Sequence, residues 1–248
     1  MGFWAALQFL TILPSPVRRA FRREEMGEAL TYFPVVGLLL GLFLWGLDAV
    51  LSAALPPLPV NVLLLGAIVI LTGAMHVDGF IDTCDGAASR TTIEERLNIM
   101  ADSRVGAFGV AGGCLLLLLK LAALFSLPSN VRVPALVLMP VVGRWSMVYA
   151  VHAYPYARGD SGRGHAFKEG GTDTRMFAGL AITLVIAIAA TRGWHGPALL
   201  ALVFLGVVAF GAYVRSRLGG LTGDSYGAVN EVAEVLTLLV LPILWRVQ

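Results

Sequence analysis

The sequence predicts an all-α protein that crosses a membrane about seven times. Of its 248 residues, 57% are hydrophobic and only 14% are charged, and the mean hydropathy is +0.79. Soluble domains have about 45–50% apolar and about 25% charged residues. The chain contains no internal repeat and no low-complexity linker. We therefore interpret residues 1–248 as a single membrane-embedded domain.

Hydrophobic runs as long as a membrane span recur along the whole chain. A helix needs about 20 apolar residues to cross the hydrocarbon core. At about 1.5 Å per residue the apolar segment 2–13 is too short. We expect it to form a short N-terminal helix that lies in the interface or docks against the bundle. Seven segments are expected to span the membrane: 30–54, 60–77, 106–127, 133–152, 175–191, 197–216 and 228–245.

The basic residues predict which side of the membrane each loop faces. Of the 18 lysines and arginines, thirteen fall in loops on one side and three in loops on the other, while Lys120 and Arg144 lie within spans. Because cytoplasmic loops carry the excess of basic residues, the first set is expected to face the cytoplasm. Every polar motif lies on that side, whereas a transporter more often spreads polar groups through the midplane. The net charge of +2 indicates no nucleic-acid partner.

The most informative motif is the acidic run at residues 76–86, which follows an apolar stretch. Asp78, Asp82 and Asp85 are spaced by four and three residues, which places them within an arc of about 60° on one helical face. Three carboxylates on one face repel each other unless a cation lies between them, and Mg2+ prefers oxygen ligands. We expect these three residues to hold Mg2+. The alternative is three acids solvated separately on a loop.

A second polar segment, residues 99–109, immediately precedes an expected span. Asp102 or Ser103 is expected to cap that helix. The glycines that follow would let backbone N–H groups approach an anion at the positive end of the helix dipole. Arg104 is suited to bidentate phosphate binding. The alternative is an ordinary helix cap beside an interfacial arginine.

A third segment runs from a glycine-rich turn into the last expected span. Asp224, Glu231 and Glu234 are spaced by seven and three residues and share one helical face. Acids that precede an apolar helix need partners, and a metal ion, protonation or an arginine of another helix would each serve. Arg144 is such an arginine, so a structural ion pair stays open beside a substrate-binding role. Gly223, in the turn, is a candidate for backbone contact with a substrate.

The glycine-rich basic loop at residues 154–167 is expected to be mobile. Arg158 in this loop is a candidate phosphate ligand, and the loop could close over a site. A loop that only sets membrane orientation is the alternative. His76 is a weaker candidate for a substrate contact, because of its position beside Asp78.

Together these acids, arginines and glycine-rich turns are the parts of a Mg2+-dependent phosphoryl-transfer site. The sequence contains no nucleophilic triad, Walker lysine or dinucleotide fingerprint. Direct in-line transfer without a covalent enzyme intermediate is therefore the simplest mechanism.

Four segments match the motifs of one known family in the same order. They are the opening LQFLTILPSP at 7–16, HVDGFIDTCDG at 76–86, the segment 99–109 and GLTGD at 220–224. They extend over nearly the whole chain, which resembles cobalamin synthase, also called adenosylcobinamide-GDP ribazoletransferase. The acidic run followed by Asp-Ser-Arg-x-Gly is the specific part of this resemblance.

The resemblance implies a reaction, a cofactor and a location. Phosphocobinamide would pass from adenosylcobinamide-GDP to the ribose hydroxyl of α-ribazole, or of its 5′-phosphate, and GMP would leave. The family uses Mg2+ and is embedded in a bacterial-type inner membrane, so membrane lipid is an expected partner.

The resemblance also assigns roles to the acids and arginines quoted above. Asp78, Asp82 and Asp85 would hold metal and pyrophosphate, and Asp82 is the first choice for the base. Asp102 with Arg104 would complete the phosphate site. Three further residues would hold a second metal ion or activate the acceptor hydroxyl: Asp224, Glu231 and Glu234.

Other readings stay open. A CDP-alcohol phosphotransferase also uses aspartates on membrane helices, but residues 85–90 match only the start of its motif. Apolar faces rich in glycine, at 37–41 and 206–211, would allow close helix packing. Self-association, or association with other enzymes of corrinoid assembly, is left open by the sequence.

Overall fold

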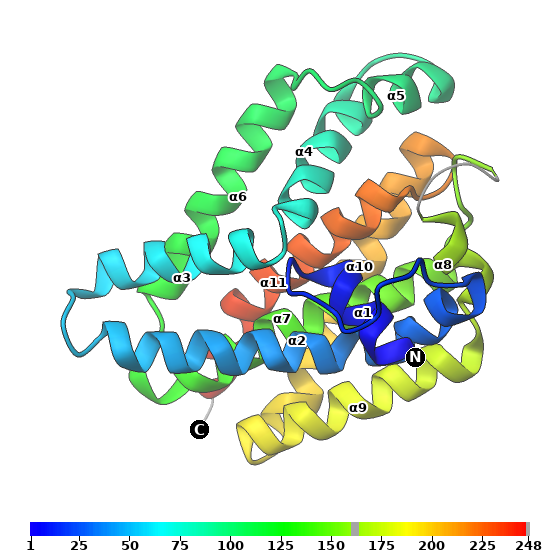
Figure 1. Ribbon diagram of the computed structural model, residues 1–248. Helices are drawn as coiled ribbons and strands as arrows, with labels where there is room; N and C mark the ends of the chain where they lie inside the picture. Colours follow the sequence, from blue (N-terminus) through cyan, green and yellow to red (C-terminus); the bar gives the residue numbers. More distant parts are fainter. Residues whose placement is uncertain (160–163, 247–248) are drawn as a thin grey trace.

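The computed structural model describes residues 1–159 and 164–246. These residues form eleven α-helices and no strand apart from one isolated bridge, so the all-α prediction is confirmed. Figure 1 shows the helices packed as a bundle. In chain order they are α1 Gly2–Leu10, α2 Arg23–Leu51, α3 Pro57–Leu71, α4 Met75–Ala88, α5 Ile93–Ile99, α6 Ala107–Phe125, α7 Ser129–Ala153, α8 His165–Gly170, α9 Asp173–Thr191, α10 His195–Leu218 and α11 Gly223–Trp245.

Six of these helices are long and apolar enough to cross a membrane: α2, α6, α7, α9, α10 and α11. The pair α3 and α4 passes the same test only when its two parts are taken together. Within the described residues the number of possible spans is therefore six or seven. This agrees with the prediction of a multi-pass membrane protein with about seven spans.

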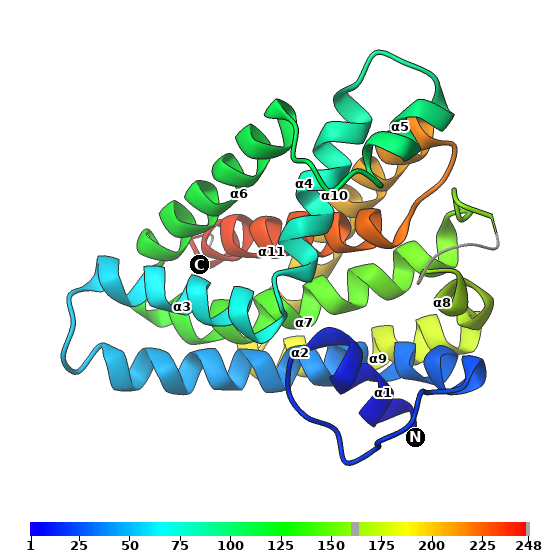
Figure 2. The same cartoon turned by 45° about the horizontal axis from the view of Figure 1, so that its top comes forward.

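The prediction of one continuous spanning helix over residues 60–77 is wrong. The chain bends by 88° between α3 and α4, at Gly73 and Ala74, which both have positive φ angles of 60° and 58°. Two successive left-handed residues cannot continue a right-handed helix. As a result the acidic run forms a separate helix, α4, which Figure 2 shows rising away from α3 beside α6.

Helix α7 lies at the centre of the bundle, between α2 and α11 (Figure 1). Two glycines of α2 allow its close contact with α7. A Cβ added at Gly37 would lie 2.6 Å from the carbonyl oxygen of Pro140, and one at Gly41 would lie 2.6 Å from that of Val137. The expected close packing of this glycine-rich face is therefore found within one chain.

The N-terminal helix α1 docks against the bundle instead of standing apart from it. Ala5, Ala6 and Leu10 are buried, and a Cβ added at Gly2 would lie 2.9 Å from the Cβ of Glu28 on α2. Of the two alternatives for the N-terminal segment, docking is the one found. The observed helix covers Gly2–Leu10, which is shorter than the expected 2–13.

We predict that Gly37→Ala lowers the thermal unfolding midpoint of the detergent-solubilised protein by several degrees. The new methyl group would meet α7 backbone, which cannot move aside as a side chain can, and such overpacking costs about 1–3 kcal/mol. Gly46→Ala in the same helix is the matched control, because its Cβ would meet open space. Equal midpoints for the two variants would contradict this packing.

Candidate active site

Helices α4 and α11 approach each other at a glycine that separates two of the predicted acids. A Cβ added at Gly79 would lie 2.5 Å from the carbonyl oxygen of Asp224 and 2.9 Å from its Cα. Only glycine allows this contact between backbones. Asp78 directly precedes Gly79, and Asp82 follows one helical turn after Asp78. The structure therefore brings these two acids of α4 beside Asp224 at the start of α11.

The electrostatic environment of Asp82 is dominated by like charges. This half-buried side chain lies within range of the negative charges of Asp78, Asp85 and Asp224. The opposing positive charge comes from Arg158, whose Nη2 is 3.3 Å from Oδ2 of Asp224. A concentration of carboxylates with one nearby guanidinium favours the binding of a cation, and of an anion that the cation and Arg158 can share.

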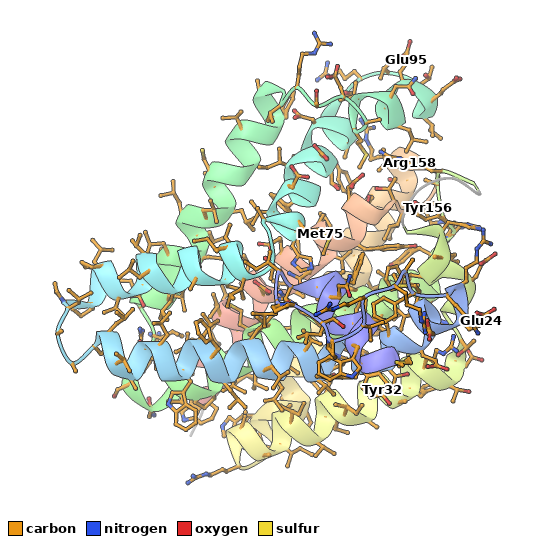
Figure 3. The ribbon with its side chains drawn as sticks, viewed as in Figure 1. Glu24, Tyr32, Met75, Glu95, Tyr156 and Arg158 are labelled. Carbon is orange, nitrogen blue, oxygen red and sulfur yellow. The ribbon has the colours of Figure 1, made fainter. Side chains whose placement is uncertain are left out.

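Backbone pairing between two loops holds Arg158 in this position. The N–H of Ala157 donates to the carbonyl oxygen of Leu221, and the N–H of Leu221 donates to that of Pro155, at 2.8 and 2.9 Å. A Cβ at Gly220 would lie 2.6 Å from the Pro155 oxygen, so the glycine-rich turn is needed for the contact. Figure 3 shows Tyr156 and Arg158 at the end of the bundle where α11 begins. The predicted 154–167 loop is therefore part of the site, although its residues 160–163 lie outside the described part.

The carboxylates fit Mg2+ by their donor chemistry. Asp78 is exposed, Asp82 and Asp224 are half-buried, and all offer hard oxygen ligands. In residues 1–159 and 164–246 no three His, Cys, Asp or Glu side chains already stand close enough to enclose a metal ion. Mg2+ commonly binds through one or two carboxylates together with substrate phosphates. The arrangement suits that shared mode of binding and does not form an all-protein cage.

Asp85, the third acid of the run, has a different partner. Its two carboxylate oxygens accept hydrogen bonds from the N–H groups of Gly106 and Gly109, each at 2.7 Å. Asp85 thus caps α6 from another helix, where the dipole is positive. The prediction that Asp102 or Ser103 caps this helix is wrong, because Gly106 occupies the cap position and no side chain of the segment bonds there. The glycines do bring N–H groups to an anion, but that anion is Asp85.

Asp102 and Arg104 form an exposed ion pair in the loop between α5 and α6. Nη2 of Arg104 lies 2.6 Å from Oδ2 of Asp102, and the Arg104 side chain is 87% exposed. Hydrogen bonds from Arg104 lower the pKa of Asp102 to about 2. The carboxylate is therefore ionised at neutral pH, and the adjacent Ser103 is exposed.

Glu231 and Glu234 belong to a separate, buried group of charges. Nζ of Lys120 lies 2.5 Å from a carboxylate oxygen of each glutamate. Arg144, which is fully buried, donates to Glu234, and Asn230 donates to the same oxygen at 3.1 Å. The alternative of a structural Arg–Glu pair is the arrangement found. Lys120 is the partner that sequence reasoning missed, although a lysine inside an apolar span is itself a signal of a buried pair.

This buried group lies deeper in the bundle than the carboxylates of α4. Glu231 is seven residues after Asp224 on the same helix, which is about 10 Å along its axis. His76 is 1% exposed, and with Lys120 and Arg144 it lines a small internal space. Residues two apart on a helix do not share a face, so His76 points away from Asp78. The structure therefore does not bring His76, Arg144, Glu231 or Glu234 to the exposed carboxylates.

The fold and this site define a polytopic helical membrane protein with an acidic, oxygen-rich centre at one end of its bundle. A model of one protein family, described as cobalamin-5-phosphate synthase, matches residues 2–242. The chain belongs to this family. No solved structure matches it.

Curated relatives agree with the family match over almost their full lengths. The adenosylcobinamide-GDP ribazoletransferase of Desulfitobacterium hafniense is 43% identical over 95% of this chain and 94% of that protein. Proteins of the same name from Geotalea daltonii and Desulforamulus reducens are 40% and 39% identical, over 96% and 95% of this chain and 96% and 94% of their own lengths. The chain is therefore an enzyme of the transferase class, and the resemblance noted in its motifs is confirmed.

We predict that Lys120→Met destabilises the protein strongly, by about 3–5 kcal/mol, because two buried glutamates would share one remaining cation. The double variant Lys120→Met, Glu231→Gln should recover part of this loss, since it restores the balance of charge. Thermal unfolding in detergent would measure both. A Lys120→Met protein as stable as the parent would show that the buried ion pairs do not form.

Proposed function

We propose that this protein transfers phosphocobinamide from adenosylcobinamide-GDP to the ribose hydroxyl of α-ribazole or its 5′-phosphate, releases GMP, and requires Mg2+. The observation that supports it most is the convergence of Asp78, Asp82 and Asp224 with Arg158 at one end of the bundle. The printed names of the relatives supply the substrates. A pyrophosphate donor needs the combination of oxygen ligands and a guanidinium that this site offers.

The transfer is an in-line displacement at phosphorus. The acceptor oxygen forms a bond to the phosphorus that carries cobinamide, the bond from that phosphorus to the bridging oxygen breaks, and the electron pair leaves with GMP. The acceptor's hydroxyl proton passes to Asp82. Uptake of a proton by this half-buried carboxylate relieves its repulsion with Asp78, Asp85 and Asp224.

Other residues position the donor. Asp78 and Asp224 would hold Mg2+, which when bound neutralises phosphate charge. Arg158, fixed beside Asp224, binds a phosphate oxygen of the donor. Arg104 precedes Gly106, whose N–H binds Asp85 of α4, and by exchanging its partner Asp102 for a phosphate oxygen it would serve as a second phosphate ligand.

We also propose that the site faces the cytoplasm from a bacterial-type inner membrane. The sequence assigns thirteen of the 18 basic residues to one set of alternate connections between the expected spans, and the segments that carry Arg158 and Asp224 belong to the same set. Soluble nucleotide substrates would reach that face directly.

GMP release tests the reaction and its metal requirement together. Purified protein in liposomes, given adenosylcobinamide-GDP and α-ribazole, should release GMP and form a cobalamin product when Mg2+ is present. A chelator should abolish release, and added Mg2+ should restore it, because the acids would otherwise repel the phosphates. Failure of folded, lipid-supplied protein to release GMP under any of these conditions would reject the proposed reaction.

Asp82→Asn should lower turnover at least about 100-fold, because general-base catalysis contributes about 10²–10⁴-fold. Its expression and thermal midpoint should stay close to those of the parent, since within residues 1–159 and 164–246 the Asp82 side chain caps no helix. Asp173→Asn is the matched control, as Asp173 is an 81% exposed aspartate in the first turn of α9. If Asp82→Asn retains turnover, Asp82 is not the base.

A further inference from the structure

A cavity of about 160 Å³ opens beside the exposed carboxylates. Asp78 of α4 and Gly223 and Asp224 of α11 line its polar part. Asp78 and Gly223 are exposed, so this part reaches the surface. The cavity therefore begins where the reacting groups of the proposed transfer meet.

The inner part of the cavity is aromatic. Phe9 of α1, Phe33 of α2 and Phe167 of α8 line it, and the last two are 1% and 2% exposed. The ring centroids of Phe9 and Phe167 are 4.4 Å apart, and those of Phe33 and Phe167 are 5.6 Å apart. Three helices from distant parts of the chain thus supply rings that pack against one another and form one aromatic wall of the cavity, which a flat aromatic group can meet.

One polar atom lies unsatisfied beside these rings. Tyr226 lines the same cavity and is 3% exposed. Its hydroxyl finds no hydrogen-bond partner in the part of the chain that the structure describes. Buried hydroxyls normally have a partner, because an unsatisfied one costs about 1–3 kcal/mol. A ligand with a single acceptor atom on an otherwise apolar ring would satisfy it.

We propose that this cavity binds the aromatic base of the acceptor nucleoside, with the base against the wall formed by Phe9, Phe33 and Phe167 and the ribose at Asp78 and Asp224. The assignment rests on the proposed function. This placement accounts for the aromatic part lying inside and the carboxylates lying at the opening. The ribose hydroxyl must reach Asp82, which is the general base of the proposed transfer. It also gives α1 a role, because Phe9 brings that helix into the site.

The size of the cavity limits it to an aromatic group, and its polarity favours this base over guanine. An apolar cavity of about 150 Å³ binds a small aromatic molecule, so this one, at about 160 Å³, has room for an aromatic group and excludes a whole nucleotide or corrinoid. Guanine carries several donors and acceptors along its edge, each of which would need a partner once buried. A benzimidazole-type base exposes one ring nitrogen, which matches the single hydroxyl of Tyr226.

Equilibrium dialysis of α-ribazole against the full-length protein in lipid nanodiscs, without donor, tests the site directly. Tyr226→Phe should weaken binding about fivefold, the value of one neutral hydrogen bond. Phe167→Leu should weaken it about tenfold through lost ring contacts. In the transfer assay both variants should raise KM for α-ribazole and leave KM for adenosylcobinamide-GDP unchanged.

Phe204→Leu is the matched control, because Phe204 packs against Trp145 and Tyr149 in a different aromatic group. It should leave α-ribazole binding unchanged. If wild-type protein transfers but both cavity variants bind α-ribazole as it does, the cavity assignment is wrong and the proposed function stands. A second result would also overturn the assignment. If GMP competes with α-ribazole and the cavity variants weaken GMP binding, the cavity binds the guanine of the donor. Binding of α-ribazole that depends on these residues, without any transfer, would support the cavity and reject the proposed function.

Discussion

The backbone contact between α4 and α11 is the constraint on which the site depends. Gly79 lies against Asp224, and Gly227 lies against His76, where an added Cβ would be 3.2 Å from the His76 Cα. A side chain at Gly79 would meet backbone and force the helices apart. That separation would move Asp224 away from Asp78 and Asp82. The loop that carries Arg158 would move with Asp224. A close approach permitted by a missing side chain thus assembles four charged residues.

Below this contact, a second polar group holds α11 to α6 and α7 inside an apolar bundle. Two cations, Lys120 and Arg144, face two anions, Glu231 and Glu234, so the buried charges balance. Lys120 lies on α6, Arg144 on α7 and both glutamates on α11. The group therefore fixes α6 and α7 against α11. Buried ion pairs contribute little net stability compared with apolar packing, but removing one partner is costly. Their value here is that they fix the register of α11, and with it the position of Asp224.

Sequence reasoning recovered the elements of the fold and part of the site. Apolar runs predicted the spans well, and the spacing of Asp78, Asp82 and Asp85 correctly predicted one helical face. The 88° bend was missed because Ala74 adopts a left-handed conformation that alanine rarely takes. The partner of Asp85 was missed because helical periodicity shows which residues share a face but not which distant backbone they meet. Gly106 lies 21 residues further along the chain.

The two polar groups show how the protein separates structural acids from acids that can bind a ligand. Both groups include carboxylates of α11, about 10 Å apart along its axis. The deeper glutamates are enclosed and neutralised by cations from the protein itself. Asp224 lies where the helix begins, beside one arginine and several further acids, so the local charge is left unbalanced. An unbalanced set of carboxylates next to water is costly unless a cation joins it, and that cation would bring phosphate oxygens with it. The electrostatics of the fold therefore place ligand binding at the end of the bundle and keep its interior closed.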